Sequence, residues 1–216
     1  MGELRFPLTA PSMSLYVIRH GQTSDDVPGQ ERPSGWSNVP LDKEGIARAH
    51  ETGKFLANKN IHHIFTSDLL RAHQTALILA QHTGAKVYPT PALRAVNWGQ
   101  IAGHAESGIK PYMNYYREHP DKQIPGGETF GDSIKRFSNV LPTFIKLADR
   151  IPTQNFAAVS HSENINMIPS IISGGRDPIS RIHLVPDAGI VHIQRDINGT
   201  LKAMPITVTK GEAING

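Results

Sequence analysis

Short apolar runs alternate with amphipathic segments along most of this 216-residue chain. The apolar runs are bounded by turn residues, which predicts buried strands. The segments between them repeat apolar residues at helical spacing, which predicts helices packed against those strands. The predicted strands cover residues 15–18, 61–66, 86–89 and 156–159, and the predicted helices cover residues 42–58, 68–83, 130–150 and 164–172. This alternation favours a three-layer α/β/α sandwich with a mostly parallel central sheet.

Two regions depart from that alternation. Residues 189–194 and 201–208 predict two strands, and the Asn198-Gly199 pair between them is typical of a β-hairpin turn. We therefore expect antiparallel pairing at one edge of the sheet. Residues 95–127 lose their periodicity among Gly, Pro and aromatic residues, which predicts a variable lobe over one end of the sheet.

Composition excludes several classes of protein. The chain has no cysteine, so disulfides, thiolate catalysis and cysteine-based metal sites are excluded. Its net charge is only +3, and no run of Lys and Arg indicates a nucleic-acid partner. No apolar stretch is long enough to predict a membrane-spanning helix or a signal peptide. We expect residues 1–13 to form a flexible leader and residues 14–216 to form a single domain of a cytoplasmic protein.

Polar residues suited to catalysis or ligand binding follow the predicted strands. Arg19 and His20 come directly after the first strand, Arg71 begins the helix after the second, and His161 follows the fourth. In sheets of this kind ligands bind beyond the carboxyl ends of the strands. We therefore expect these four side chains to meet at one edge of the sheet.

Two arginines and two histidines at one edge predict phosphoryl transfer. Arginine forms paired, charge-assisted hydrogen bonds to phosphate oxygens, so Arg19 and Arg71 are expected to clamp the group. Their charges disfavour protonation of His20, which leaves it neutral and nucleophilic near pH 7. His161 is expected to donate a hydrogen bond to the same oxygens. This chemistry needs no cofactor and no metal, and no HExxH motif or carboxylate cluster indicates a metal site.

These motifs in combination resemble the histidine phosphatase superfamily, also called the phosphoglycerate-mutase-like family. The similarity extends from Leu15 to about Gln194. The motifs that carry it are Arg19-His20-Gly21 with Thr23, Ser34-Gly35-Trp36, Ser67-Asp68-Leu69-Leu70-Arg71-Ala72 and Val159-Ser160-His161. The resemblance implies that His20 is phosphorylated and that Arg19, Arg71 and His161 complete the phosphate pocket. It also implies substrate contacts at Gly21, Thr23, Ser34, Gly35, Ser162 and Glu163.

The chain departs from the family pattern at Ala95. Members that act on ordinary phosphate esters usually carry a Glu there, which protonates the leaving alcohol. One interpretation is a leaving group that needs no acid, as in phosphohistidine or a phosphoanhydride. Another is an acid elsewhere, for which we favour Glu128 over Glu163, although Glu128 near a helix start could instead serve stability. The third is a protein that binds phosphate without turnover.

Two further departures bear on function. Asp26 stands where the family usually has an Asn that donates to phosphate, and a carboxylate there repels phosphate unless it is protonated or turned away. The resemblance implies that true mutases hold a second acidic group of the substrate with basic residues, and these are not evident in the lobe. Only Lys110, Arg117 and Lys122 could serve. The prediction is a phosphohydrolase that acts through phosphohistidine on a small phosphorylated metabolite, phosphohistidine or an anhydride. The alternatives are a phosphoglycerate-type mutase and a catalytically impaired phospho-ligand-binding protein.

Overall fold

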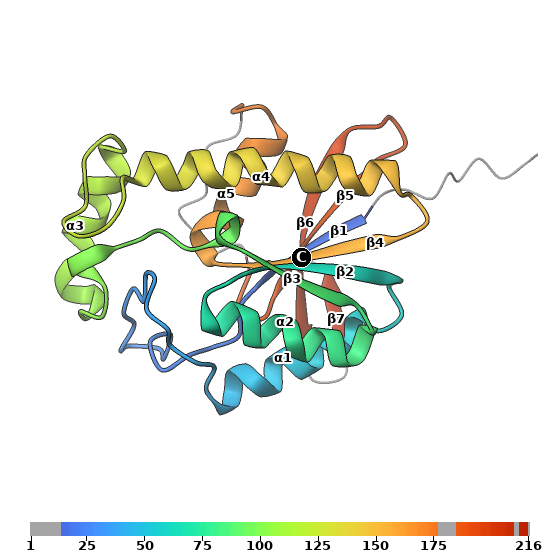
Figure 1. The fold of residues 1–216 in the computed structure, drawn as a ribbon, viewed down its shortest axis with the longest axis horizontal. Helices are drawn as coiled ribbons and strands as arrows, with labels where there is room; N and C mark the ends of the chain where they lie inside the picture. Colours follow the sequence, from blue (N-terminus) through green and yellow to red (C-terminus); the bar gives the residue numbers. More distant parts are fainter. Residues whose placement is uncertain (1–13, 177–184, 210–211, 216) are drawn as a thin grey trace, which may run out of the picture.

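The chain forms a seven-stranded sheet between two layers of helices (Figure 1). A computed structural model describes residues 14–176, 185–209 and 212–215, so the expected leader at residues 1–13 lies outside the described residues. The strand order is β3-β2-β4-β1-β5-β6-β7. The strands are β1 (Ser14–Arg19), β2 (Ile61–Ser67), β3 (Lys86–Thr90), β4 (Asn155–Ser160), β5 (Ile190–Arg195), β6 (Leu201–Thr209) and β7 (Glu212–Asn215). The predicted α/β/α sandwich is confirmed.

Strand direction divides the sheet into two parts. The strands β3, β2, β4 and β1 are parallel to one another, so their carboxyl ends share one edge. The strands β5, β6 and β7 add antiparallel pairs beyond β1, as the hairpin signal predicts for the first two. Because β5 runs against β1, the start of β5 lies at the same edge as the end of β1, where Ile190 pairs with Ile18.

The helices begin and end where their local sequence favours it. They are α1 (Lys43–Leu56), α2 (Leu70–Thr83), α3 (Glu106–Glu118), α4 (Phe130–Arg150) and α5 (Ser162–Ile172). The Asp42 side chain caps α1 by accepting a hydrogen bond from the Gly45 amide. Gly84 ends α2 in the left-handed conformation, with φ of 71°. Figure 1 shows α4 and α5 on one face of the sheet and α1 and α2 on the other.

Two apolar clusters fill the spaces between these layers. Leu15, Val17 and Phe156 point to the α4 side, where Phe137 and Phe144 pack. The intervening residues of the central strands, such as Ile18 and Val159, point to the α1 and α2 side. Central strands are therefore buried on both faces, which explains why they read as continuous apolar runs. None of the described helices is long and apolar enough to cross a membrane.

The lobe between β3 and α4 contains a helix that sequence periodicity does not predict. This helix is α3, which lies at one end of the molecule (Figure 1). It contains Pro111, and Met113 is its only buried residue. Ile109, Met113 and Tyr116 stand at helical spacing and pack against the core, but this short apolar period is interrupted by Pro111 and surrounded by Gly and aromatic residues, which explains the omission.

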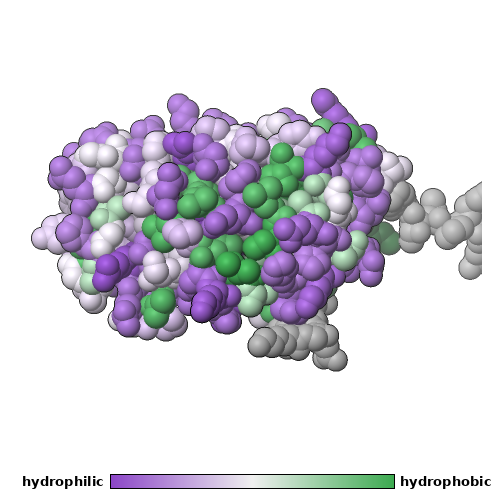
Figure 2. All heavy atoms as spheres, turned by 60° about the horizontal axis from the view of Figure 1, so that its bottom comes forward, coloured by the Kyte–Doolittle hydropathy of each residue, from purple (hydrophilic) through white to green (hydrophobic). Residues whose placement is uncertain are grey.

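The surface carries mixed charge. Figure 2 shows charged and polar side chains interspersed with apolar ones on the side of the molecule where α1 and α2 lie. Ile46 of α1 and Leu77 of α2 are exposed by 42% and 46%. Single exposed apolar side chains of this kind are ordinary on protein surfaces.

Candidate active site

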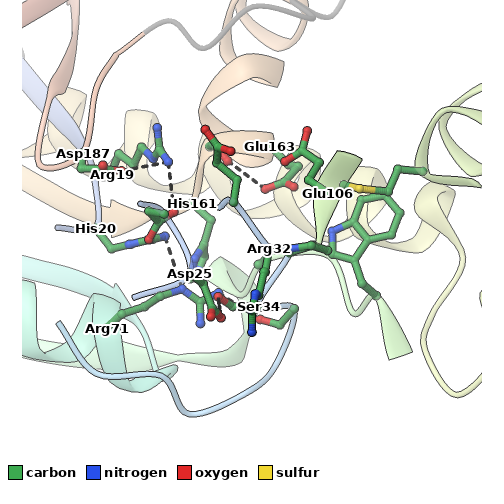
Figure 3. Close-up of a pocket in the computed structure, with 18 of the residues that line it drawn as sticks. Arg19, His20, Asp25, Arg32, Ser34, Arg71, Glu106, His161, Glu163 and Asp187 are labelled. Atoms are coloured by element: carbon green, nitrogen blue, oxygen red, sulfur yellow. Dashed lines mark hydrogen bonds and ion pairs between the residues drawn. The ribbon is translucent and has the colours of Figure 1, made fainter. Parts of the chain in front are cut away.

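A cavity of about 250 Å³ opens at the edge where β1, β2 and β4 end (Figure 3). Arg19, His20, Arg71 and His161 all line it. The structure thus brings together the four side chains that the sequence places after the strands. Parallel strands produce this result, because their carboxyl ends lie side by side.

His20 lines the cavity, and its two ring nitrogens have different partners. Its Nδ1 lies 2.8 Å from the Gly21 carbonyl oxygen. A carbonyl only accepts, so Nδ1 carries the proton and donates. Nε2 therefore holds the lone pair, and Arg71 Nε donates to it at 3.3 Å. This is the tautomer that a nucleophilic imidazole requires.

The electrostatics of the cavity keep both histidines neutral. Burial, together with the charges of Arg71 and Arg19, lowers the pKa of His20 to about 3, against the opposing effect of Asp26. Burial and Arg71 likewise hold the pKa of His161 well below its ordinary value. Both imidazole rings are therefore uncharged at neutral pH.

Arg71 is held rigidly in the first turn of α2. Only 2% of it is exposed. Its guanidinium donates to the Gly35 carbonyl at 2.9 Å and to the Ser37 carbonyl at 3.2 Å. These bonds tie the first loop to α2 and fix the guanidinium beside His20 Nε2. A preorganised cation of this kind suits the charge that develops in phosphoryl transfer.

Arg19 lies between two carboxylates. Its Nη2 is 3.3 Å from Asp26 Oδ1 and 2.8 Å from Asp187 Oδ1, the second contact being an ion pair without hydrogen-bond alignment. Asp26 also accepts from the amide and the hydroxyl of Thr23, at 3.0 and 2.6 Å. The carboxylate of Asp26 is thus turned toward Thr23 and Arg19, one of the two conditions expected for phosphate to bind beside it.

His161 contacts the second strand through Ser67. Its Nε2 lies 2.9 Å from Ser67 Oγ, and its ring centroid lies 5.1 Å from that of His20. Its Nδ1 is buried and has no hydrogen-bond partner among the described residues, and the same is true of Arg19 Nε. Buried polar groups are nearly always paired in proteins, so these two atoms mark a place for a polar ligand.

The remaining predicted contact residues divide into two groups. Ser34, Gly35, Ser162 and Glu163 line the cavity, as does Ala95. Gly21 and Thr23 are not among its lining residues.

The two residues outside the lining support the pocket from behind. A side chain at position 21 would place its Cβ 2.6 Å from the Gly45 carbonyl oxygen, so only glycine fits there. Thr23 is fully buried and holds Asp26.

Glu128, the favoured proton donor, is not brought to the cavity. Its carboxylate forms a salt bridge with Arg136 and accepts from the Asn97 amide at 2.8 Å. Thr129, not Glu128, caps α4. Because both oxygens of Glu128 are engaged away from His20, its placement fits a structural role and does not fit proton donation.

Several cavity residues escaped sequence reasoning. Asp187 precedes β5 and enters because β5 runs antiparallel to β1. Arg32 enters from the first loop, and Glu106 and Arg117 enter from α3. The predicted edge strand was a signal for Asp187, and the sequence named Arg117 as a candidate to bind a second acidic group, but Glu106 had no signal. In the described part of the chain no group of three His, Asp or Glu residues is placed to hold a metal ion.

Burial sets the titration of Asp187. It raises the pKa of this carboxyl to about 6, and nearby Arg19 offsets only part of that effect. Asp187 and Asp26 share one guanidinium, and Asp187 takes up a proton first, because interactions with His20, Thr23 and Arg19 outweigh burial and hold the pKa of Asp26 below its ordinary value.

Comparison with known proteins agrees with this geometry. The family model described as histidine phosphatase superfamily, branch 1, matches residues 15–203. The chain belongs to the histidine phosphatase superfamily. The predicted family is thereby confirmed.

Relatives in this superfamily carry both kinds of name. A probable phosphoglycerate mutase of Yersinia pestis is 30% identical over 140 residues, which cover 62% of this chain and 64% of the relative. The chain thus spans slightly less than two thirds of that relative's length. A mycobacterial glucosyl-3-phosphoglycerate phosphatase superposes with a TM-score of 0.71 at 22% identity, covering 89% of this chain and 97% of the other.

Two other solved structures show the same fold. A phosphoglycerate mutase from Bacillus anthracis gives a TM-score of 0.72 at 18% identity, covering 89% of this chain and 91% of the other. A putative α-ribazole-5′-phosphate phosphatase from Escherichia coli gives 0.71 at 22% identity, covering 94% and 97%. At these identities the likeness establishes the fold of this chain.

Proposed function

We propose that this chain is a phosphohydrolase in which His20 Nε2 carries the phosphoryl group between two steps. The unprotonated Nε2, which lies beside Arg71 while Nδ1 donates its proton to the Gly21 carbonyl, carries this proposal. In the first step a bond forms between Nε2 and phosphorus, and the bond from phosphorus to the leaving oxygen breaks. In the second, water attacks phosphorus, the bond to Nε2 breaks, and inorganic phosphate and a proton are released.

The pocket offers donors to every side of the transferring group. Arg19 and Arg71 supply charge-assisted hydrogen bonds, and the unpartnered His161 Nδ1 and Arg19 Nε are satisfied by phosphoryl oxygens. As phosphorylation withdraws electrons from the ring, the Gly21 carbonyl stabilises the positive charge that develops at Nδ1. These contacts strengthen in the transition state, which is the requirement for catalysis.

We propose Glu163 as the proton donor for alkyl leaving groups. It lines the cavity beside Ala95, at the start of α5, whereas Glu128 does not. Ser162 Oγ donates to Glu163 Oε2 at 3.1 Å, which orients the carboxyl. A leaving group of low basicity, such as an aryl oxide or a histidine, departs without this acid.

Mutase activity is the second candidate, because relatives bear that name. A phosphoglycerate mutase must hold a substrate carboxylate in addition to phosphate. Of the three basic residues that the sequence offers in the lobe, only Arg117 lines the cavity, and Glu106 lines it as well. This balance favours hydrolysis.

Rapid acid-free quenching of the enzyme with a ³²P-labelled substrate tests the proposal. The expected result is label on one histidine, stable in alkali and labile in acid, with phosphate released at the same rate as label turns over. His20→Ala is expected to lose the label and at least about 10⁴-fold in kcat/KM. The matched control is His62→Ala, an exposed histidine on β2, which should retain both.

Two results would count against the proposal. Label that persists in a folded His20→Ala variant excludes His20 as the nucleophile. Label that passes to phosphoglycerate rather than to water identifies a mutase.

A further inference from the structure

The two ring nitrogens of His161 lie in different surroundings. Nε2 lies 2.9 Å from Ser67 Oγ. Nδ1 is buried and has no hydrogen-bond partner among the described residues. The ring lines the cavity beside that of His20, with the two centroids 5.1 Å apart (Figure 3). Nδ1 is therefore the His161 atom that is left for a phosphoryl oxygen at His20.

The position of one proton decides whether Nδ1 attracts or repels that oxygen. Burial and the charge of Arg71 hold the pKa of His161 well below its ordinary value, so the neutral ring carries a single proton. A neutral imidazole donates from the nitrogen that holds the proton and accepts at the other. With the proton on Nδ1 the ring donates to a phosphoryl oxygen, whereas with the proton on Nε2 two lone pairs face each other.

Ser67 lies where it can select between these two tautomers. It is the last residue of β2, and Thr66 before it pairs with Val159 of the neighbouring strand β4. The two parallel strands therefore end at the same edge, which brings Ser67 beside His161. Ser67 is fully buried and is not among the residues that line the cavity. Its hydroxyl therefore cannot bond a phosphoryl group in the cavity directly.

The protons around Ser67 Oγ fix the direction of its bond to His161. The Leu69 amide donates to Oγ at 3.3 Å, which uses one lone pair of the oxygen. In the described part of the chain the other partner of Oγ is His161 Nε2. If Nε2 carried the proton, the hydroxyl proton of Ser67 would be buried without an acceptor. Buried polar groups are nearly always paired, so the hydroxyl donates to Nε2 and the ring proton is on Nδ1.

We propose that Ser67 is a positioning residue, which holds His161 in the tautomer that donates from Nδ1 to the phosphoryl group. This inference rests on the proposed function, in which His20 carries that group. The bond that His161 donates strengthens as charge builds on the phosphoryl oxygens during transfer. Ser67 touches neither the substrate nor the reacting atoms, so its effect on the rate depends on His161.

Nitrogen NMR of the wild-type chain tests the tautomer without any turnover. Labelling the histidine rings with ¹⁵N distinguishes a protonated nitrogen from one that holds a lone pair. The chain has 11 histidines, and the signals of His161 are those lost in His161→Asn. At neutral pH we expect the proton of His161 on Nδ1, because the bond that one ring nitrogen forms sets the protonation of the other.

Removal of the hydroxyl tests whether Ser67 acts through His161. Ser67→Ala should move part of the ring proton to Nε2 and lower kcat by about 10–100-fold, with a smaller effect on KM. In a His161→Asn background the same change should lower kcat by less than about twofold, because the side chain through which Ser67 acts is then absent. A purely structural role of Ser67 would lower kcat by the same factor in both backgrounds.

Ser14→Ala is the matched control. The Ser14 hydroxyl also lies 2.9 Å from the Nε2 of a partly buried histidine, His192. Ser14 begins β1, at the opposite end of that strand from the cavity. Its replacement should leave kcat within about twofold and the tautomer of His161 unchanged.

The outcomes separate this inference from the proposed function. A wild-type His161 with its proton on Nε2 overturns the inference, even where a labelled His20 supports the hydrolase, and this measurement depends on no Ser67 variant. An equal loss of kcat from Ser67→Ala with and without His161 also overturns it.

The converse result is equally informative. If His20 is never labelled, the proposed function fails. The inference then stands if the Nδ1 proton is observed and Ser67→Ala weakens the binding of inorganic phosphate by about fivefold in calorimetry, and it is overturned otherwise.

Discussion

The inner end of the cavity is formed by residues that directly follow strands, whereas its outer wall comes from the first loop and from α3. Arg71 and His161 are only 2% and 1% exposed, and they form hydrogen bonds with Gly35 and Ser67 respectively. The outer carboxylates are more exposed, and Glu106 enters from a helix that buries one residue. Substitutions at the inner end therefore affect the reaction itself, whereas residues of the outer wall can be substituted without disturbing the sheet.

This difference predicts that substitutions at the inner end affect all substrates alike. Arg71→Ala removes a preorganised cation and leaves the carbonyls of Gly35 and Ser37 without their donor. We expect kcat to fall by about 10²–10³-fold on aryl and alkyl phosphates equally. Steady-state kinetics on both substrate types measures the effect.

Arg48→Ala is the matched control for Arg71, because Arg48 pairs with Glu44 on the exposed face of α1. It should leave kcat within about twofold. A folded Arg71→Ala enzyme that retains more than a tenth of the activity would remove Arg71 from the mechanism.

At the boundary between the two regions, Glu163 and Glu128 are expected to behave differently. Glu163→Gln should slow alkyl phosphate hydrolysis by about 10–100-fold and leave aryl phosphates nearly unchanged, because aryl oxides leave without an acid. Glu128→Gln breaks the salt bridge to Arg136 and should instead lower the free energy of unfolding by about 1–3 kcal/mol. Paired kinetics and urea unfolding distinguish the two roles.

The assignment of the proton donor fails if Glu163→Gln acts equally on both kinds of substrate. A selective loss of alkyl phosphate hydrolysis in Glu128→Gln would restore Glu128 as the donor.

The smallest expected effect concerns Asp187. Its pKa is about 6 in the folded chain against 3.8 for an ordinary Asp. A raised pKa means that the folded state holds this proton more tightly, so the stability that it contributes is full below pH 4 and lost as pH rises through 6. Asp187→Asn should therefore gain about 1–3 kcal/mol relative to wild type between pH 4 and 7.

Urea unfolding of both proteins at each pH measures that difference. His20, whose pKa is lowered to about 3, makes stability rise with pH over much of the same range, but it does so in both proteins and cancels in the difference. A difference that stays flat with pH would show that Asp187 titrates normally.

Local patterns were sufficient for most of the sandwich. The predicted helix 130–150 coincides with α4, and Asp42 and Gly84 bound α1 and α2 as expected. These features depend on residues close together in sequence, such as a capping carboxylate and the amide three residues on. The helix α3 has a weaker local signal, because its apolar period is limited to Ile109, Met113 and Tyr116 and is interrupted by Pro111.

The proton donor shows where local reasoning ends. Glu128 follows a Gly-Gly pair near a helix start, a context that by itself suggests a pocket residue. Its direction is set by Arg136, which lies two turns along α4 and faces Ala95 and Glu128 together. Only packing of α4 against the lobe determines which way that carboxylate points.

The sequence by itself determined the reactive edge of this protein. Residues that follow parallel strands must meet at one edge, so Arg19, His20, Arg71 and His161 were predictable from strand positions alone. The tertiary structure alone decided which carboxylates join them. Asp187 arrives at the start of an antiparallel strand and Glu106 through a helix far along the chain, and the positions of these elements in the sequence do not by themselves place either side chain in the cavity. The set of carboxylates that lines the cavity is therefore a property of long-range packing.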